Sequence, residues 1–436
     1  MHARIEQTAA RLSVARVTPG ERIGVLCEPC AEFLVLTLAC WKIGAVIVPI
    51  STRYPSEKVK TALRSVNCKR VLASPGRQAP PMQAIGHFVP GGTDFDAITF
   101  DELTLDMEAD ANVIFTSGSS GGPKGVLHTI ANHYYSALGS HENIPFGRGD
   151  AWLASLAIYH VGGFSLIMRA LIAGGRIIFP QPSQPLADAL MHPAVTHLSL
   201  VPTQLLRLLD QPGCVHRLKR LKAILLGGDA IPPALLDHAN ACGLPVCTTY
   251  GSTEAASQIA TSVPGRPREG AKVLPYRELK IAPDGEICIK GKTLFKGYVH
   301  AATTDPASDA EGWFHTGDIG TLDVNGTLHV TGRKDLMFIS GGENIHPEEI
   351  ERVLMSLENV EQAVVVPVKD AQFTHRPAAF IRTRNNTPLD PEKIKAELKT
   401  HLEPFKVPKT FHSWPDCLPD SAKPLRKQLA GLASDA

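Results

Sequence analysis

The chain has 436 residues, of which 44% are hydrophobic and 20% charged, with a net charge of +1. This length exceeds one ordinary core, so a folded globular protein of two or three domains is expected. The balanced charge gives no electrostatic footprint for nucleic acid or an anionic membrane. The most apolar stretch, 33–50, is interrupted by Lys42 and Gly44, so no membrane insertion is expected either.

Short apolar runs alternate with stretches of helical period through the first three quarters of the chain. The predicted strands are 22–26, 45–48, 70–73, 113–115, 152–156, 176–179, 197–201, 223–226 and 246–250. The predicted helices are 30–43, 55–65, 163–173, 203–209 and 233–241. Several strands are apolar throughout, as strands covered by helices on both faces are. This pattern predicts an α/β fold of layered, mostly parallel sheets and helices.

Cysteine usage and the N-terminus indicate a reducing, cytoplasmic location. Nine scattered cysteines do not suggest a disulfide framework, and the first residues lack the apolar core of a secretory signal. Cys27 and Cys30 form a C-x-x-C pair at a predicted strand-to-helix turn. No thioredoxin-like unit surrounds the pair, so two ordinary thiols are expected there. No His/Cys cluster has the spacing of a zinc site.

The pattern changes near residue 264. The segments 278–281, 285–290, 320–322 and 327–330 predict short antiparallel strands, which form a β-rich subdomain at about 265–334. The segment 346–349 then predicts a helix start, with Pro in its first position and acids in its first turn. Strands at 360–367 and 378–381 and a helix at 389–402 follow. We therefore expect a large N-terminal domain at 1–334 and a small, mobile α+β domain at 335–436, hinged at Asp335.

A Gly/Ser-rich loop, 116–125, follows the predicted strand 113–115. Its successive N–H groups form an anion-binding concavity, to which hydroxyl groups and Lys124 add donors. The candidate phosphate ligands are Thr116, Ser117, Gly118, Ser119, Ser120 and Lys124. No Gly-Lys-Ser/Thr has the spacing of a Walker A loop. The alternative is a flexible Gly/Ser linker.

Three further segments suggest a nucleotide site. Glu254, just after a Tyr250-Gly251 turn, is a candidate Mg²⁺ ligand, because this cation binds through one or two carboxylates plus phosphates. The alternative is a helix start capped by Ser252 or Thr253. Asp318 and Arg333 are candidate partners of ribose hydroxyls. Their alternatives are a turn aspartate and a solvated surface charge.

Taken in order, these motifs resemble the adenylate-forming superfamily of acyl- and aryl-CoA ligases, luciferases and peptide-synthetase adenylation domains, from about Arg4 to Leu429. The resemblance implies ATP, Mg²⁺ and CoA as co-substrates and cofactor, and a hinge at Asp335. It implies that Lys423, Glu254 and His160 are catalytic and that Glu254 binds Mg²⁺. The residues it assigns to the nucleoside are Gly228, Asp229, Tyr250, Gly251, Thr253, Asp318 and Arg333. The residues it places beside CoA are Ser340, Gly341 and Gly342.

Two departures from the family pattern are visible. Ala422 stands where the family usually has Gly before the lysine, and the chain begins within what corresponds to the family's first helix. If position 422 needs a positive φ, the Ala costs about 1 kcal/mol, so the lysine loop would be held differently.

The class of carboxylic acid that the protein activates is indicated by a segment of the chain that lacks Asp and Glu. Amino-acid-activating members anchor an ammonium with an Asp, but 157–164 contains none, so a cationic substrate is not expected. The helix that follows is apolar except for Ser165 and one cation, Arg169. A buried charge needs a partner, so Arg169 either snorkels, pairs with a protein carboxylate, or binds a second carboxylate on the substrate.

Five segments carry a finer resemblance: 159–169, 199–205, 225–232, 250–259 and 375–377 are similar to the o-succinylbenzoate–CoA ligases of menaquinone biosynthesis. The resemblance implies a dicarboxylate whose aromatic carboxylate binds Arg169, in a pocket lined by His160, Thr203 and Ser252. The sequence thus predicts an AMP-forming acid–CoA ligase that releases pyrophosphate. A general aryl- or fatty-acyl-CoA ligase, and an enzyme that loads a carrier protein in trans, stay open as alternatives, as does a homo-oligomer.

Overall fold

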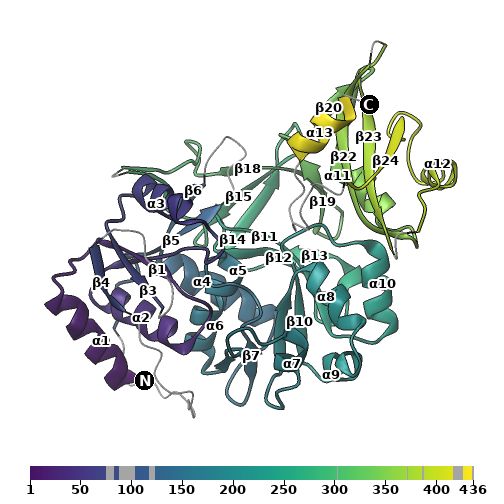
Figure 1. Ribbon diagram of the computed structural model, residues 1–436. Helices are drawn as coiled ribbons and strands as arrows, with labels where there is room; N and C mark the ends of the chain where they lie inside the picture. The colour runs from purple at the N-terminus through teal and green to yellow at the C-terminus, as the bar shows by residue number, and fades with distance from the viewer. Residues whose placement is uncertain are drawn as a thin grey trace.

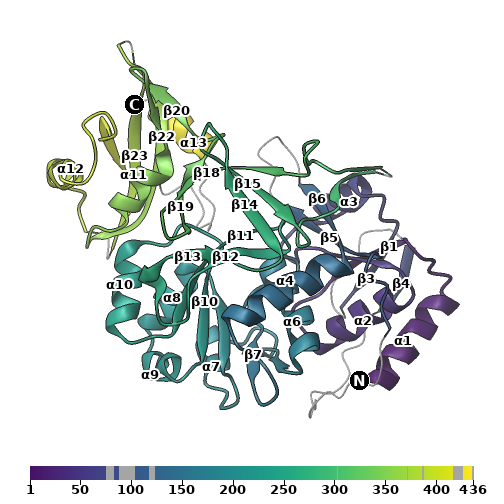
Figure 2. The same ribbon diagram turned by 180° about the vertical axis from the view of Figure 1, so that it is seen from behind.

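The computed structural model describes residues 1–74, 83–87, 104–116, 123–301, 303–370, 372–384, 387–415 and 426–434. Two large sheets and the helices around them form the main body, and the last hundred residues form a smaller part at its upper right in Figure 1. Figure 2 shows the same arrangement from behind. The predicted α/β fold class is confirmed.

The first sheet has eight strands in the order β17-β16-β6-β5-β2-β1-β3-β4. Their bounds are Arg22–Leu26 (β1), Val46–Pro49 (β2), Arg70–Ala73 (β3), Gln83–His87 (β4), Asp110–Thr116 (β5), Lys124–Thr129 (β6), Gly297–His300 (β16) and Thr303–Asp305 (β17). Strands β1 to β5 pair in parallel, and β6 returns antiparallel to β5. The β5–β6 hairpin therefore projects the candidate phosphate loop from the carboxyl end of β5.

The second sheet has eleven strands in the order β14-β15-β18-β19-β13-β12-β11-β10-β9-β7-β8. Their bounds are Ala151–Leu153 (β7), Arg176–Ile178 (β8), His197–Leu200 (β9), Ala223–Gly227 (β10), Val246–Ser252 (β11), Ser257–Thr261 (β12), Ala271–Val273 (β13), Arg277–Ile281 (β14), Glu286–Gly291 (β15), Phe314–Leu322 (β18) and Thr327–Arg333 (β19). The neighbours β8, β7, β9, β10 and β11 pair in parallel. The other neighbours, in the order β11, β12, β13, β19, β18, β15 and β14, pair antiparallel.

Helices of the main body pack between and around these sheets. They are His2–Val14 (α1), Ala31–Lys42 (α2), Ser56–Ser65 (α3), Ile130–Asn143 (α4), Val161–Phe164 (α5), Leu166–Ala173 (α6), Leu186–Leu190 (α7), Pro202–Leu209 (α8), Cys214–Lys219 (α9) and Pro233–Ala241 (α10), with a 3₁₀ turn at Pro267–Glu269. Apolar side chains of α1, α2, α4 and α6 share one buried cluster with strand β1. Thr129 and Asn132 form a capping box that fixes the start of α4 directly after β6.

The C-terminal part has its own core. A hairpin of Phe338–Ser340 (β20) and Glu343–Ile345 (β21) precedes a three-stranded sheet of Val360–Asp370 (β22), Thr374–Thr383 (β23) and Thr410–Ser413 (β24). Helices Pro347–Leu354 (α11), Pro391–Leu398 (α12) and Arg426–Ser434 (α13) pack on it. Pro347 opens α11, as predicted, and buried Glu351 of α11 pairs with Arg426 of α13. This pair ties the last helix to the small sheet.

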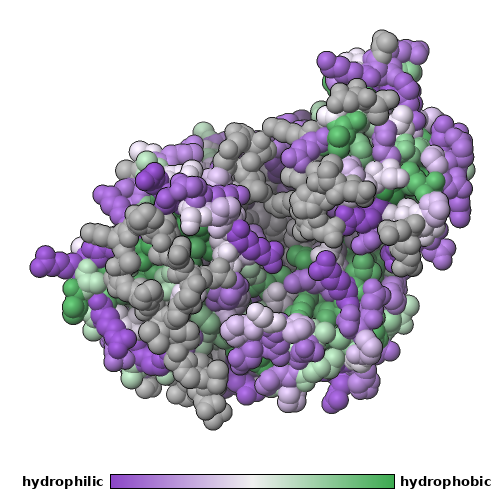
Figure 3. Space-filling view, in the orientation of Figure 1, coloured by the Kyte–Doolittle hydropathy of each residue, from purple (hydrophilic) through white to green (hydrophobic). Residues whose placement is uncertain are grey.

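The surface in the view of Figure 3 is mainly hydrophilic over its described residues, with hydrophobic side chains in small groups. Within the described ranges, no helix combines the length and the apolarity that crossing a bilayer requires.

Candidate active site

The predicted site residues follow neighbouring parallel strands of the second sheet. His160 follows β7, Thr203 follows β9, Asp229 follows β10, and Tyr250 lies near the end of β11. The carboxyl ends of parallel strands meet at one edge of a sheet, which is where open α/β sheets bind ligands. The fold therefore gathers residues that are up to 90 positions apart in the chain at one edge.

Tyr250, Asp318 and Arg333 form a hydrogen-bonded group. The Tyr250 hydroxyl donates to Asp318 Oδ2 at 2.6 Å, and Arg333 Nη1 donates to Asp318 Oδ1 at 3.1 Å. Asp318 and Arg333 are direct partners across the β18–β19 ladder. Burial and the Asp318 carboxylate raise the pKa of Tyr250 well above its ordinary value, so the phenol stays protonated. The two residues predicted to hold ribose thus lie beside the residue predicted to cover the adenine.

Arg333 also reaches the predicted hinge residue. Its Nε donates to Asp335 Oδ1 at 3.0 Å, and its Nη1 donates to the carbonyl oxygen of Thr316 at 2.9 Å. Burial lowers the pKa of the guanidinium, but Asp335 and Asp318 outweigh it, so the pKa of Arg333 is raised. The guanidinium is a permanent cation at this edge. Asp318 lies within strand β18 rather than in a turn, and Arg333 is paired with two carboxylates rather than solvated alone, so neither alternative fits.

Glu254 lies in a turn between β11 and β12. No helix starts here, so the alternative of a helix cap at Ser252 or Thr253 is wrong; Ser252 Oγ instead accepts from the Ala255 N–H at 3.2 Å within the turn. The Tyr298 hydroxyl donates to Glu254 Oε1 at 2.8 Å. Among the described residues, no hydrogen bond reaches Oε2. A carboxylate oriented in this way fits Mg²⁺, which takes one or two protein carboxylates and otherwise phosphate and water.

The β5–β6 hairpin, which includes the candidate phosphate ligands Thr116 and Lys124, lies next to the Glu254 carboxylate. Thr116 ends β5 and pairs with Lys124 at the start of β6, and Lys124 Nζ lies 5.2 Å from the centre of the Tyr298 ring. Tyr298 itself pairs with Val126 of β6. Tyr298 therefore contacts both the predicted Mg²⁺ ligand and the predicted phosphate lysine. Ser117, Gly118, Ser119 and Ser120 lie outside the described residues, as do Lys423 and Ala422.

A buried histidine joins the hairpin to the Glu254 turn. His128 of β6 is fully buried, and its Nε2 lies 2.7 Å from the Thr253 carbonyl oxygen. Burial lowers the pKa of His128 to about 4, so the ring is neutral and its Nε2–H donates to this oxygen. The carbonyl next to Glu254 is thus fixed to the strand that carries Lys124.

Arg169, on α6, is buried, with 5% of its surface exposed. Its Nη2 donates to Gln258 Oε1 at 2.7 Å and lies 3.5 Å from Ser257 Oγ, and its guanidinium lies 5.1 Å from the centre of the Trp152 ring. No Asp or Glu of the described residues lies within ion-pair distance of it. The two structural alternatives for Arg169, snorkelling and pairing with a protein carboxylate, are therefore wrong over the described part of the chain.

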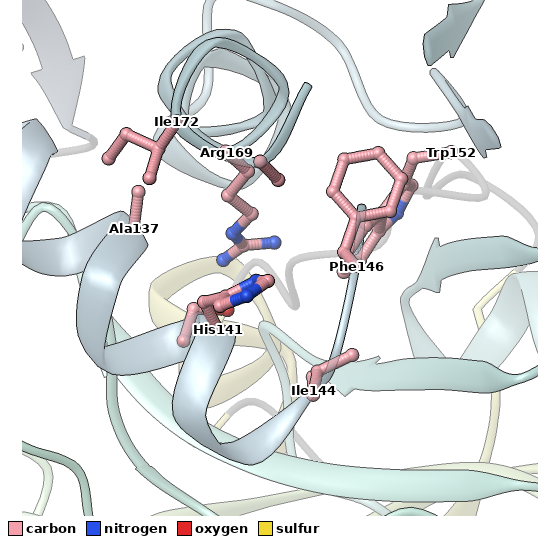
Figure 4. A pocket seen from close by; sticks show the side chains of 9 residues that line it. Ala137, His141, Ile144, Phe146, Trp152, Arg169 and Ile172 are labelled. Atoms are coloured by element: carbon pink, nitrogen blue, oxygen red, sulfur yellow. The ribbon is translucent and has the colours of Figure 1, made fainter. Parts of the chain in front are cut away.

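The Arg169 guanidinium is charged and closely surrounded. Burial lowers the pKa of Arg169 to about 10, which leaves the group charged at neutral pH. Figure 4 shows the guanidinium extending from α6 toward His141 at the end of α4, into a cavity of about 10 Å³. This cavity holds about one water molecule. The space beside the guanidinium is therefore too small for a larger carboxylic acid, and its partners Ser257 and Gln258 are themselves buried.

Ser257 begins β12 in an unusual backbone conformation. The φ of Ser257 is 117° and that of Ala256 is 52°, backbone angles that residues other than glycine rarely adopt. A Cβ at Gly251 would lie 2.1 Å from the Ser257 carbonyl oxygen, so only glycine fits opposite this turn. Such strain collects at binding sites. It directs the Ser257 side chain toward Arg169.

The remaining predicted residues lie at the same edge or in the C-terminal part. His160 is the exposed N-cap residue of α5, its ring 4.8 Å from that of Tyr159. Gly228 takes a φ of 85° after β10, and Asp229 Oδ1 accepts from the Ala230 N–H. Ser340 ends β20, and Gly341 and Gly342 form the β20–β21 turn with φ values of 59° and 92°. The Ser340 hydroxyl is buried without a partner in the described chain.

The amino-acid sequence matches the AMP-binding enzyme family over residues 1–299 and the AMP-binding enzyme C-terminal domain over residues 349–423. These matches cover most of the chain, including every predicted nucleotide residue up to Glu254. The chain belongs to the AMP-binding enzyme family.

Relatives within the family are similar along nearly the whole chain. The 2-succinylbenzoate–CoA ligase of Geobacillus sp. (strain WCH70) is 32% identical, over 99% of this chain and 92% of the relative. The same enzyme of Listeria monocytogenes serotype 4b is 32% identical, over 93% and 87%. The structure of o-succinylbenzoate CoA synthetase (MenE) from Bacillus subtilis with the acyl-adenylate intermediate OSB-AMP superposes with a TM-score of 0.84 at 30% identity, covering 98% of this chain and 92% of that one. Its complex with ATP and magnesium ion has the same TM-score and identity, over 98% and 93%.

The structure adds three residues that sequence reasoning missed. Tyr298 contacts Glu254 across 44 positions, while Ser257 and Gln258 contact Arg169 across almost 90. Ser257 and Gln258 lie within the segment that suggested the finer resemblance, but nothing in their spacing connects them to Arg169. Tyr298 has no local signal at all, because its role depends on β16 pairing with β6.

Proposed function

We propose that this chain is a 2-succinylbenzoate–CoA ligase, which forms an acyl-adenylate from ATP and then a CoA thioester, releasing pyrophosphate and AMP. The observation that supports this substrate is the state of Arg169, a buried cation with no acid partner in the described chain. A buried charge left with neutral partners alone is costly, and a carboxylate on the substrate supplies the missing partner. The two relatives reported above are named for that dicarboxylate.

The aromatic carboxylate, in this proposal, binds the Arg169 guanidinium and displaces its contact with Ser257 Oγ. Gln258 holds the guanidinium from one side and Trp152 stacks near it, so little side-chain entropy is lost when the acid binds. The succinyl carboxylate is then directed toward the nucleotide, along a wall made by His160, Thr203 and Ser252. We assign His160 to the catalytic set because it follows β7 at the sheet edge that also carries Thr203, Asp229 and Tyr250.

Adenylation brings two anions together. A succinyl carboxylate oxygen attacks the α-phosphorus of ATP, and pyrophosphate leaves. Lys124, the N–H groups of the loop 116–125 and Lys423 would stabilise the charge that develops on the phosphoryl oxygens and on pyrophosphate. Glu254 would hold Mg²⁺, which neutralises phosphate charge. Tyr250, Gly251, Thr253, Gly228 and Asp229 would hold the adenine, and Asp318 and Arg333 would hold the ribose.

Thioester formation needs a different neighbour, because the thiol of CoA must reach the acyl carbon and displace AMP. We assign this change to rotation of residues 335–436 about Asp335 against residues 1–334, with residues 265–334 as the β-rich subdomain. Rotation would replace Lys423 at the carbonyl with Ser340, Gly341 and Gly342, which would border CoA. The hydrogen bond from Arg333 to Asp335 would break or re-form during this step. We place the enzyme in the cytoplasm, where both ATP and CoA are supplied.

The test is a product assay with purified protein, ATP, Mg²⁺ and CoA. We expect 2-succinylbenzoate to yield AMP, pyrophosphate and a CoA thioester far faster than benzoate or medium-chain fatty acids do. Faster turnover of benzoate would make the chain a general aryl-CoA ligase instead. Pyrophosphate release that depends on a carrier protein rather than on CoA would indicate loading in trans.

A further inference from the structure

Gln258 of β12 is a buried, uncharged residue that contacts two buried arginines. Its Oε1 accepts from Arg169 Nη2 at 2.7 Å, and its main-chain oxygen accepts from Arg277 Nη1. The other hydrogen bonds of the two guanidinium groups reach only a hydroxyl and carbonyl oxygens, and no Asp or Glu of the described residues lies within ion-pair distance of them. Two buried cations therefore meet at one neutral residue, and an anion bound beside them would offset the cost of their burial.

The side-chain amide of Gln258 is held in one orientation by a chain of hydrogen bonds. Gln258 Nε2 lies 2.8 Å from Thr261 Oγ1, which lies 2.9 Å from Thr249 Oγ1. The Thr249 hydroxyl donates to the Ala260 carbonyl oxygen at 3.1 Å. A guanidinium only donates, so the amide atom that faces Arg169 is the oxygen. The amide nitrogen then donates to Thr261, whose hydroxyl donates to Thr249, and every group in the chain has a partner.

The neutrality of Gln258 leaves the charge of Arg169 uncompensated. A glutamate has the same shape and would make the same contact, but it would form a buried ion pair with the guanidinium. An acid in the site would then compete with a protein carboxylate. The contact with Ser257 Oγ is longer, at 3.5 Å, than the 2.7 Å contact with Gln258. An incoming carboxylate therefore displaces the serine, while the glutamine keeps the guanidinium in place.

We propose that Gln258 is a specificity-determining residue: it positions Arg169 for the ring carboxylate without neutralising it, and so favours a dicarboxylate over a monocarboxylate. Gln258 acts through Arg169 and does not touch the acid. This role rests on the proposed function, because it concerns the same acid site. The β11–β12 register fixes the position of Gln258 relative to the nucleotide half, since it pairs directly with Gly251.

The first test is Gln258→Glu, which supplies the missing acid partner at nearly constant shape. Thioester formation is measured with 2-succinylbenzoate and with 4-oxo-4-phenylbutanoate, which lacks the ring carboxylate. The KM for 2-succinylbenzoate should rise about tenfold or more, because the ring carboxylate competes with the new side chain for a charged donor. The KM for the monocarboxylate and kcat for both acids should change little. Gln181→Glu is the matched control: it adds the same charge at an exposed position and should leave both KM values unchanged.

A double-mutant cycle tests whether Gln258 acts through Arg169. Gln258→Met removes the acceptor without adding charge and should raise the KM for 2-succinylbenzoate several-fold. In the Arg169→Met background the same change should have no further effect. An equal effect in both backgrounds would overturn the proposal, as would a Gln258→Glu variant in which the KM changes by the same factor for both acids. If Gln258→Glu does not fold, the cycle with methionine decides the question alone.

The contact is also measurable without substrate. Thermal unfolding should show that Gln258→Glu costs less stability in the unaltered background than in Arg169→Met, where the new carboxylate is buried without the guanidinium. An equal loss of stability in both backgrounds would contradict the pairing on which the role depends. If the pairing is present and the unaltered chain does not activate 2-succinylbenzoate, the proposed function fails and the contact stands.

Discussion

Replacing Arg169 with Met tests how the second carboxylate is recognised. Its side chain is buried, contacts Gln258 and Ser257, and carries a charge that no acid of the described chain neutralises. A hydrogen bond to a charged group contributes about 1.5–3 kcal/mol. Losing it should raise the KM for 2-succinylbenzoate roughly 10- to 150-fold. The KM for 4-oxo-4-phenylbutanoate, which lacks the ring carboxylate, should change little.

The assay measures thioester formation with both acids, for the unaltered chain and for two variants. Arg277→Met is the matched control, because Arg277 is also buried but donates only to main-chain oxygens, those of Gln258, Pro275 and Ser136. It should lower stability and affect both acids equally. Arg169→Met leaves Gln258 Oε1 without its donor, so the thermal stability of both variants is measured beside the KM values for the two acids. An equal rise in KM for both acids would refute the recognition of the second carboxylate by Arg169.

Three further predictions concern the nucleotide half. Asp318→Asn removes the negative charge that Arg333 faces and replaces one carboxylate oxygen with an amide donor. It should raise the KM for ATP about tenfold or more, since the bonds to Tyr250 and Arg333 lose their charge assistance; an unchanged KM would show that this pair does not serve ATP. Tyr298→Phe frees Glu254 and should raise the Mg²⁺ concentration needed for half-maximal adenylation several-fold without slowing thioester formation from pre-formed acyl-adenylate; equal effects on both steps would argue against this positioning role. His128→Gln should flatten the loss of thermal stability in acid, measured from pH 7 to pH 4.

The sign of the pH effect follows from the burial of His128. Its pKa in the folded chain is about 4, against an ordinary 6.5, so the unfolded chain binds more protons between these values. Stability therefore falls as the pH is lowered through this window, by about 3 kcal/mol for this group once both states are protonated. A His128→Gln variant with the same acid dependence as the unaltered chain would contradict this assignment.

Much of the fold was predictable because its parallel strands are apolar throughout. The strands at 22–26 and 70–73 have the predicted bounds, and α10 begins and ends as predicted. The β6 strand was missed, because it starts with Lys-Gly and carries the polar His128 and Thr129, whose partners come from α4 and from the Glu254 turn. Helix α4 was missed for a related reason, since its buried face includes the polar residues Asn132, His133, Ser136 and Ser140.

The candidate site was predictable only where function is carried by short local motifs. Tyr250 and Glu254 share such a motif, Asp318 lies just before the predicted strand 320–322, and Arg333 lies just after the predicted strand 327–330. That Asp318 and Arg333 pair directly depends on the β18–β19 register, which no local pattern encodes. The contacts of Arg169 depend likewise on α6 packing beside β12. The antiparallel strands after residue 264 were predicted as a subdomain, and the structure adds that they continue both large sheets.

The most direct test of the account compares kcat/KM of the unaltered chain for 2-succinylbenzoate and for 4-oxo-4-phenylbutanoate, with saturating ATP, Mg²⁺ and CoA. The two acids share the carboxylate that is activated and differ only in the ring carboxylate. A ligase in which Arg169 binds the ring carboxylate should prefer 2-succinylbenzoate by roughly 10- to 150-fold in kcat/KM. This ratio corresponds to the free energy of one hydrogen bond to a charged group. Equal kcat/KM values for the two acids would contradict the account.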